Sequence, residues 1–218
     1  MSFDPLTTNQ KEAIRYLGFG AHTPDERTLA LVSECVKELA AAVSPKSIWR
    51  DFPLSLKPDN QIEMGYFTVK SRNLSRNLTG CSRIILFGAT LGIGADNLIS
   101  RNSRLNVTKG VVLQACAASM IEDYCDYCQE EIRQQMAVQH LYLRPRFSPG
   151  YGDFPLESQR EITRILNTPK EIGLTLTDSM LMVPIKSVTA VIGLSPLDEH
   201  CHQHGCEACE KTDCAFRR

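Results

Sequence analysis

The spacing of apolar residues predicts helices near the start of the chain. Residues 7–17 have the pattern of a short helix that ends at glycines. Pro24 is expected to open a second helix, because proline is favoured at the first helical position. Along that second helix Leu31, Cys35 and Leu39 recur on one face, which is typical of an amphipathic helix packed against a core.

Strand-like patterns occur early, centrally and late in the chain. The segments expected to form strands are residues 48–56, 61–69, 83–88, 173–182 and 186–194. A turn containing Pro58 is expected between the first two of them. Residues 83–88 (Arg-Ile-Ile-Leu-Phe-Gly) form a short apolar run, which gives the strongest buried-strand signal in the chain.

The longest periodic segment, from Asn106 to about Gln139, predicts a single long helix. Its mostly apolar stripe follows steps of four and three residues, the spacing of one helix face. The stripe consists of Val107, Val111, Gln114, Ala118, Ile121, Cys125, Cys128 and Ile132. Cys125 and Cys128 have the spacing of a redox pair, but their place in the stripe favours a role as small core residues.

Helices and strands do not alternate strictly along the chain, and further short helices are expected at residues 74–78 and 156–166. This order argues for an α+β fold, a single domain with a largely antiparallel mixed sheet and a long central helix. We expect the domain to span residues 1–196 and a cysteine-rich tail to span residues 197–218.

The composition narrows the class of protein and of partner. With 43% hydrophobic and 22% charged residues, a chain of 218 residues can bury a full core. A formal net charge of −1 gives no electrostatic case for binding nucleic acid or an anionic membrane. No signal pattern is visible, and no apolar run approaches the roughly eighteen residues of a membrane span. The odd number of cysteines, nine, fits a reducing compartment, so a cytoplasmic location is expected.

Four of the nine cysteines, Cys201, Cys206, Cys209 and Cys214, lie within the last eighteen residues. Four thiolates at this density can surround one tetrahedral zinc ion or hold an iron–sulfur cluster. Their spacing matches neither the common paired zinc pattern nor the usual ferredoxin pattern, and three nearby histidines are possible substitute ligands. The alternative is a terminal segment with incidental cysteines. We expect a metal or cluster site in this tail.

Prolines and glycines are concentrated between residues 144 and 159, the sequence Arg-Pro-Arg-Phe-Ser-Pro-Gly-Tyr-Gly-Asp-Phe-Pro-Leu-Glu-Ser-Gln. Each proline fixes a backbone angle and removes an N–H donor, while the glycines permit positive φ angles. The pattern predicts a stiff, shaped loop that carries Arg146, Tyr151 and Asp153 and is suited to binding a ligand. The alternative is a proline-rich connector whose arginines are merely solvated.

Within this loop, Arg146-Phe-Ser-Pro-Gly150-Tyr151 has the form Arg-x-x-x-Gly-Tyr. It resembles the S-adenosylmethionine-binding motif of the activation (reactivation) domain of cobalamin-dependent methionine synthase. Residues 115–126, which include Glu122, and residues 172–182 and 184–194 also resemble that domain. Two features depart from the family pattern. A tyrosine expected near residues 191–193 is absent, and Asp51 is only a candidate for an early aspartate.

The resemblance implies a free-standing module that binds S-adenosylmethionine and supports reductive remethylation of a cobalamin. Arg146 is expected to bind the ligand's carboxylate through its planar fork. Glu122 is expected to meet the ammonium group or a ribose hydroxyl. Gly150 is expected to let the backbone reach the adenine or ribose, and Tyr151 to pack beside it. No catalytic side chain is expected, because the chemistry belongs to the cofactor and the methyl donor.

The same resemblance implies partners. Cobalamin is expected to be carried by a separate methionine synthase or corrinoid methyltransferase, so that this chain acts in trans as a component of a methyltransferase. An electron donor such as flavodoxin or ferredoxin is also expected. The competing hypothesis is a redox partner of a corrinoid protein that carries a metal or iron–sulfur cluster and does not bind S-adenosylmethionine; the arginine loop is then only scaffold.

Overall fold

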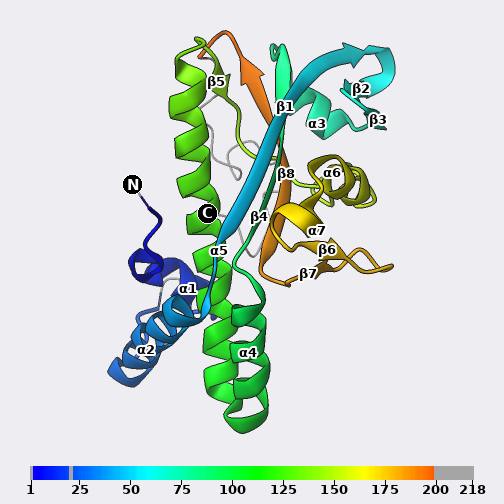
Figure 1. The fold of residues 1–218 in the computed structure, drawn as a ribbon. Coiled ribbons are helices and arrows are strands. Elements are labelled where there is room, and N and C mark those ends of the chain that lie inside the picture. Colours follow the sequence, from blue (N-terminus) through cyan, green and yellow to red (C-terminus); the bar gives the residue numbers. More distant parts are fainter. Residues whose placement is uncertain (1, 20–21, 199–218) are drawn as a thin grey trace. The chain divides into compact units, whose positions relative to one another are not determined.

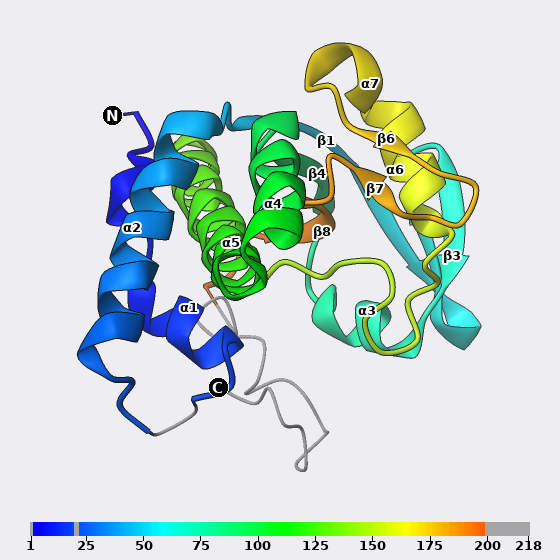
Figure 2. The same cartoon turned by 90° about the horizontal axis from the view of Figure 1, so that it is seen from below.

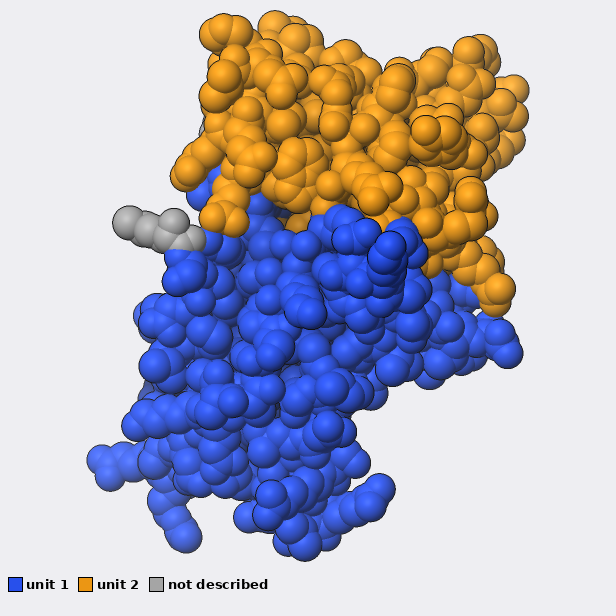
Figure 3. All heavy atoms as spheres, viewed as in Figure 1, with its two compact units in different colours: residues 1–48, 88–130, 167–188 blue, residues 49–87, 131–166, 189–218 orange. Residues whose placement is uncertain are grey.

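The computed structural model describes residues 2–19 and 22–198. The chain divides into two compact units, coloured separately in Figure 3. Unit 1 comprises Met1–Ile48, Gly88–Glu130 and Asn167–Val188, and unit 2 comprises Trp49–Phe87, Glu131–Leu166 and Thr189–Arg218. Each unit is therefore assembled from segments far apart in the sequence. The expected boundary between a domain and a tail at residue 196 stays a prediction.

Unit 1 is mainly helical (Figures 1 and 2). Its elements are η1 (Pro5–Thr7), α1 (Gln10–Tyr16), α2 (Glu26–Ala42), α4 (Ile93–Leu105), most of α5 (Val107–Ala137), α7 (Thr168–Glu171), and the hairpin of β6 (Thr175–Leu176) and β7 (Met182–Val183). The side chain of Asp25 caps α2 by accepting a 2.8 Å hydrogen bond from the Thr28 N–H. This cap explains why α2 begins one residue beyond Asp25.

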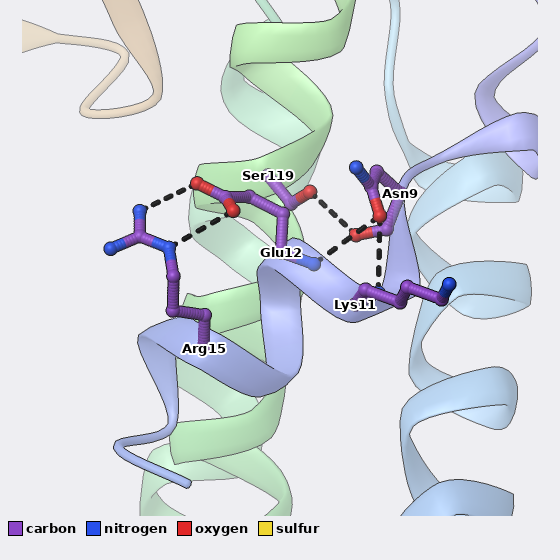
Figure 4. Close-up of polar contacts among 5 residues, drawn as sticks. All are labelled: Asn9, Lys11, Glu12, Arg15 and Ser119. Carbon is purple, nitrogen blue, oxygen red and sulfur yellow. Dashed lines mark hydrogen bonds and ion pairs between the residues drawn. The ribbon is translucent and has the colours of Figure 1, made fainter. Parts of the chain in front are cut away.

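Asn9 connects α1 to α5 and also caps α1 (Figure 4). Its side-chain oxygen accepts hydrogen bonds from the N–H groups of Lys11 and Glu12 at 3.1 and 3.3 Å. Its backbone carbonyl accepts a 2.9 Å bond from the Ser119 hydroxyl, and its backbone N–H donates to Asp123 at 2.8 Å. The start of α1 is thereby fixed on the side of the long helix.

Unit 2 contains most of a six-stranded sheet in the order β3-β2-β1-β4-β8-β5. The strands are β1 (Lys46–Lys57), β2 (Gln61–Met64), β3 (Phe67–Lys70), β4 (Arg83–Thr90), β5 (Tyr142–Leu143) and β8 (Ser187–Ser195), and the short helices nearby are η2 (Pro58–Asn60), α3 (Arg72–Asn77) and α6 (Ser158–Leu166). The pairs β1–β2, β2–β3 and β5–β8 are antiparallel. The predicted α+β class, with a largely antiparallel sheet and a long helix, is confirmed.

Two predicted strands were wrong in extent. The segment 61–69 is two strands, β2 and β3, because Gly65 turns the chain with a φ of 60°. The segment 173–182 contributes only the two-residue strands of the β6–β7 hairpin, which is a separate small sheet. Strand β8 is buried along nearly its whole length, which indicates that both of its faces are covered.

Helix α4 was not predicted, and its presence explains an error in the stripe assigned to α5. Gly94 lies against the backbone of Ala42 so closely that a Cβ atom there would collide with the Ala42 carbonyl. Gly110 of α5 is similarly close to α4, because a Cβ atom on Gly110 would lie 2.8 Å from the Cα of Ser103. Packing against α4 and α2 thus decides which face of α5 is buried.

The predicted stripe holds only in the second half of α5. Val107 and Val111 are 69% and 55% exposed, and the buried side chains nearby are Val112, Leu113 and Cys116. Further along, the predicted residues Ile121, Cys125, Cys128 and Ile132 are buried. The expectation that Cys125 and Cys128 are core residues is therefore confirmed. In the described part of the chain, no helix has the combination of length and apolar character needed to cross a bilayer.

Candidate functional site

The arginine loop, residues 144–159, is held against β8 in unit 2 by backbone hydrogen bonds. Arg144 N–H donates to the Gly193 carbonyl at 2.8 Å. Phe147 and Val191 exchange two hydrogen bonds of 2.9 Å each, which forms an isolated antiparallel bridge. Arg146 lies between these two attachment points and is half-buried. The backbone that carries Arg146 is therefore pinned on both sides, as the proline content predicted.

A closed turn follows and presents the rest of the motif. The Gly150 N–H donates to the Phe154 carbonyl at 2.8 Å, and the Phe154 N–H donates to the Tyr151 carbonyl at 3.0 Å. Gly150 has a φ of 89°, a conformation that side chains disfavour. Tyr151 at the turn is 66% exposed. Arg146, Gly150 and Tyr151 thus lie on one ordered loop.

Phe154 lies beneath the loop rather than on its surface. Its side chain is only 1% exposed and packs on Phe147, with ring centroids 6.3 Å apart. An aromatic ring at this position stabilises the turn from beneath by burying apolar area. The surface of the loop is therefore formed by Tyr151 and the glycines, without Phe154.

Asp153 anchors the loop to α3 rather than facing a ligand. Its carboxylate accepts hydrogen bonds from the Ser71 hydroxyl at 2.6 Å and from the N–H groups of Arg72 and Asn73 at 2.7 and 3.0 Å. Desolvation of the carboxylate opposes ionisation, but these hydrogen bonds outweigh it and hold the pKa of Asp153 below its ordinary value.

Gly152 permits this docking of the loop on α3. It has a φ of 54°, and a Cβ atom at this position would lie 3.0 Å from the side-chain carbonyl carbon and oxygen of Asn73. A larger residue would therefore push the loop away from the helix that Asp153 caps. Both glycines of the loop have positive φ angles, but only Gly152 also meets a neighbouring element this closely.

Glu122, the fourth predicted binding residue, belongs to α5 in unit 1, whereas Arg146, Gly150 and Tyr151 belong to unit 2. Glu122 is half-buried. The pKa of its neighbour Asp123 is raised, first because the carboxyl is buried, and further because Asp126, Glu12 and Glu122 surround it with negative charge. Glu122 therefore lies in an acidic part of unit 1.

The two departures from the family pattern have structural explanations. The family pattern has a tyrosine near residues 191–193. A Cβ atom on Gly193 would lie 2.6 Å from Cys81 Sγ and 3.0 Å from Arg144 Cγ. Val191, two residues earlier, is completely buried, so neither position has room for a tyrosine ring. Asp51 lies on β1 and forms an ion pair with Arg83. Sequence reasoning did not predict either packing arrangement.

The predicted metal ligands Cys201, Cys206, Cys209 and Cys214 lie outside the described residues. Within the described part, no group of three or more histidine, cysteine or acidic side chains is arranged to hold a metal ion. The five cysteines there are thiols, and Cys81 is the half-exposed one among otherwise buried side chains. The metal or cluster site of the tail therefore stays a prediction.

Comparisons with known proteins agree with the fold described above. A search of curated proteins gave no match. The crystal structure of the MetH reactivation domain bound to AdoHcy has a similar fold, with a TM-score of 0.65, 17% identity, and coverage of 86% of this chain and 75% of that chain. The family described as vitamin B12 dependent methionine synthase, activation domain, matches residues 79–214, more than half of the 218 residues. With its Arg-x-x-x-Gly-Tyr loop docked inside the matched region, this chain belongs to the family of methionine synthase activation domains.

Proposed function

We propose that the protein binds S-adenosylmethionine and supports the reductive remethylation of a cobalamin carried by a separate methionine synthase or corrinoid methyltransferase. Family membership supports the role in activation. The similar crystal structure contains AdoHcy, which is what remains of S-adenosylmethionine once its methyl group has left. The observation that carries the proposal is the loop that holds Arg146, Gly150 and Tyr151 in one fixed arrangement.

Arg146 is assigned to the carboxylate of S-adenosylmethionine. A guanidinium group binds a carboxylate through two parallel N–H···O bonds, which fixes both position and orientation. Because the backbone is pinned to β8 at Arg144 and Phe147, little backbone freedom remains to be lost when the ligand binds. A half-buried arginine on a fixed loop is therefore a preorganised anchor.

Tyr151 and Gly150 are assigned to the adenosine part of the ligand. The Tyr151 side chain is 66% exposed, so its ring has an uncovered face for a planar base. Aromatic pairing contributes about 0.5–1.5 kcal/mol beyond the area that it buries. Gly150 has no side chain to cover the turn, so backbone atoms there are accessible to ribose or adenine.

Glu122, on α5 in unit 1, is separately assigned to an ammonium group or a ribose hydroxyl. The support is electrostatic, because Glu122, Asp126 and Glu12 form the acidic surroundings that raise the pKa of Asp123. Such surroundings favour a cationic group. The chain's own residues thus bind and orient the methyl donor, while the cobalt of a bound corrinoid supplies the acceptor for the methyl group.

The test is methyl transfer to a corrinoid protein from the same organism. Its cobalt is poised as Co(II), and an electron donor such as flavodoxin or ferredoxin is added with radiolabelled S-adenosylmethionine. Label should reach the cobalt only when this protein is present, and Arg146→Ala should slow the transfer. Arg27→Ala, on the exposed side of α2, is the matched control and should transfer at the wild-type rate. An unchanged rate of cobalt methylation with wild-type protein, across every corrinoid partner tried, would contradict the proposal.

A further inference from the structure

A depression in unit 1, apart from the arginine loop, has the features of a small-molecule site. It is lined by residues of α4, by Gln114 of α5, and by Ile185 and Lys186 just before β8, and its volume is about 300 Å³. Figure 2 shows α4 lying beside α5. At about 30 Å³ for each water molecule, this space accommodates a ligand of on the order of ten non-hydrogen atoms.

Asp96 gives the depression an acceptor that lacks a donor. One carboxylate oxygen, Oδ2, accepts a 2.8 Å hydrogen bond from the Ile185 N–H. The other, Oδ1, is buried and has no hydrogen-bond partner among the described residues. A buried carboxylate oxygen without a donor is unfavourable, so this atom favours a ligand that brings an N–H or O–H group.

Lys186 gives the same depression a cation with unused donors. Its ammonium group has three N–H donors, and one of them is directed to the Gln114 carbonyl at 3.2 Å. Burial lowers the pKa of Lys186, and the negative charge of Asp96 acts in the opposite direction. No ion pair involves Lys186 in the described part of the chain. Arg104, exposed on α4, places a second cation on the rim.

The remaining lining is partly apolar. Ile99 is almost completely buried, and Ile185 is 63% exposed. Ile185 therefore offers an apolar surface against which an aliphatic group can pack. A divalent metal ion does not fit this set, because Asp96 is its single carboxylate and a lysine lies beside it. A polyphosphate does not fit either, because the orphaned acceptor would face its negative charge.

We propose that this depression binds a free aliphatic α-amino acid. Asp96 Oδ1 accepts from the ligand's ammonium group, and Lys186, helped by Arg104, binds its carboxylate. The aliphatic side chain lies along Ile99 and Ile185. This ligand supplies a donor to the orphaned oxygen, an anion to the cation, and apolar area to the two isoleucines, within the available volume. This second binding site goes beyond the proposed binding of S-adenosylmethionine at the arginine loop.

The experiment is an NMR titration of the ¹⁵N-labelled full chain with L-leucine. The backbone amides of Ile185 and Lys186 should shift in a saturable way at millimolar or lower concentrations. Two analogues test the polar contacts without any substitution: 4-methylpentanoate lacks the ammonium group, and 3-methylbutylamine lacks the carboxylate. Each should bind at least about tenfold more weakly, because each loses a charge-assisted hydrogen bond. No saturable shift with leucine, or equal binding of all three compounds, would overturn the proposal.

Variants test the two charged residues directly. Asp96→Asn keeps an oxygen for the Ile185 N–H but turns an NH₂ group toward the ligand's ammonium, and Lys186→Met removes the cation. Both should weaken leucine binding roughly tenfold or more. Asp59→Asn and Lys170→Met, at exposed positions of η2 and α7, are the charge-matched controls. Wild-type affinity in both site variants would overturn the assignment.

S-adenosylmethionine itself carries an amino-acid end, so it is the other possible source of this chemistry. Saturating S-adenosylmethionine should leave the leucine-induced shifts unchanged, because the arginine loop is a different site. Displacement of leucine would overturn the proposal of a separate amino-acid site. Arg146→Ala should lose S-adenosylmethionine binding and keep leucine binding. This variant therefore distinguishes a failure of the proposed function from a failure of the amino-acid site.

Discussion

Replacing Asp153 should destabilise unit 2, because this carboxylate joins the arginine loop to α3. In Asp153→Ala three hydrogen bonds are lost, from the Ser71 hydroxyl and from the N–H groups of Arg72 and Asn73. A hydrogen bond to a charged group contributes about 1.5–3 kcal/mol when it is buried. Asp153 is exposed, so water replaces part of what is lost. We therefore expect a total loss of about 2 kcal/mol.

In a chain of this length, 1 kcal/mol corresponds to a shift in melting temperature of roughly 2–4 °C, so Asp153→Ala should melt about 4–8 °C lower. Urea denaturation at neutral pH measures the loss of free energy directly. Glu157→Gln, an exposed change near the end of the loop, is the control and should be neutral. In a double-mutant cycle, Ser71→Ala should be less damaging in the Asp153→Ala background than alone. Wild-type stability of Asp153→Ala would refute the anchoring role.

The same contacts predict a dependence on pH. The pKa of Asp153 lies below its ordinary value in the folded state, so the ionised form favours folding. Its contribution is complete above about pH 5 and is lost as the pH falls below about 4 and through the folded-state pKa. Asp153→Asn cannot titrate. The stability difference between wild type and Asp153→Asn should therefore shrink toward acid pH, and a constant difference would contradict this explanation.

Two further predictions concern β8 and the tail. Gly193→Ala should lower the free energy of unfolding by about 1–3 kcal/mol, because the new Cβ atom would lie 2.6 Å from Cys81 Sγ. Urea denaturation measures this loss. A variant as stable as wild type would show that this region repacks freely. Anaerobically purified protein should contain stoichiometric zinc or iron, and removal of the residues after Pro196 should abolish the metal without changing the melting temperature. Only background metal in the full chain would count against the tail site.

The sequence predicted the arginine loop well because prolines and glycines act on the backbone locally. Pro145 and Pro149 stiffen the segment, and Gly150 has the positive φ that its residue type allows. The role of Asp153 could not be predicted in the same way, because its partner Ser71 is 82 positions away in the sequence. Only the fold brings the loop to the start of α3.

Helix α4 shows a second limit of sequence patterns. Glycine precedes it, and several asparagines and serines within it have low helix propensity, so the segment lacks a strong periodic signal. Missing this helix led to the wrong face for the first half of α5, where Val107 and Val111 are exposed. The role of Glu122 rested on family resemblance, because a half-buried carboxylate on a long helix gives no signal of its own.

Isothermal titration calorimetry with S-adenosylmethionine tests the central claim most directly. Wild-type protein should bind the ligand, and Arg146→Ala should bind it about ten- to a hundredfold more weakly, because a charge-assisted contact of roughly 1.5–3 kcal/mol is removed. The melting temperature of the ligand-free variant should stay close to that of wild type, since the loop is held by backbone hydrogen bonds and by Asp153. Equal affinity of the two proteins would remove Arg146 from the site, and the absence of binding heat and of any thermal stabilisation by the ligand in wild type would contradict the claim itself.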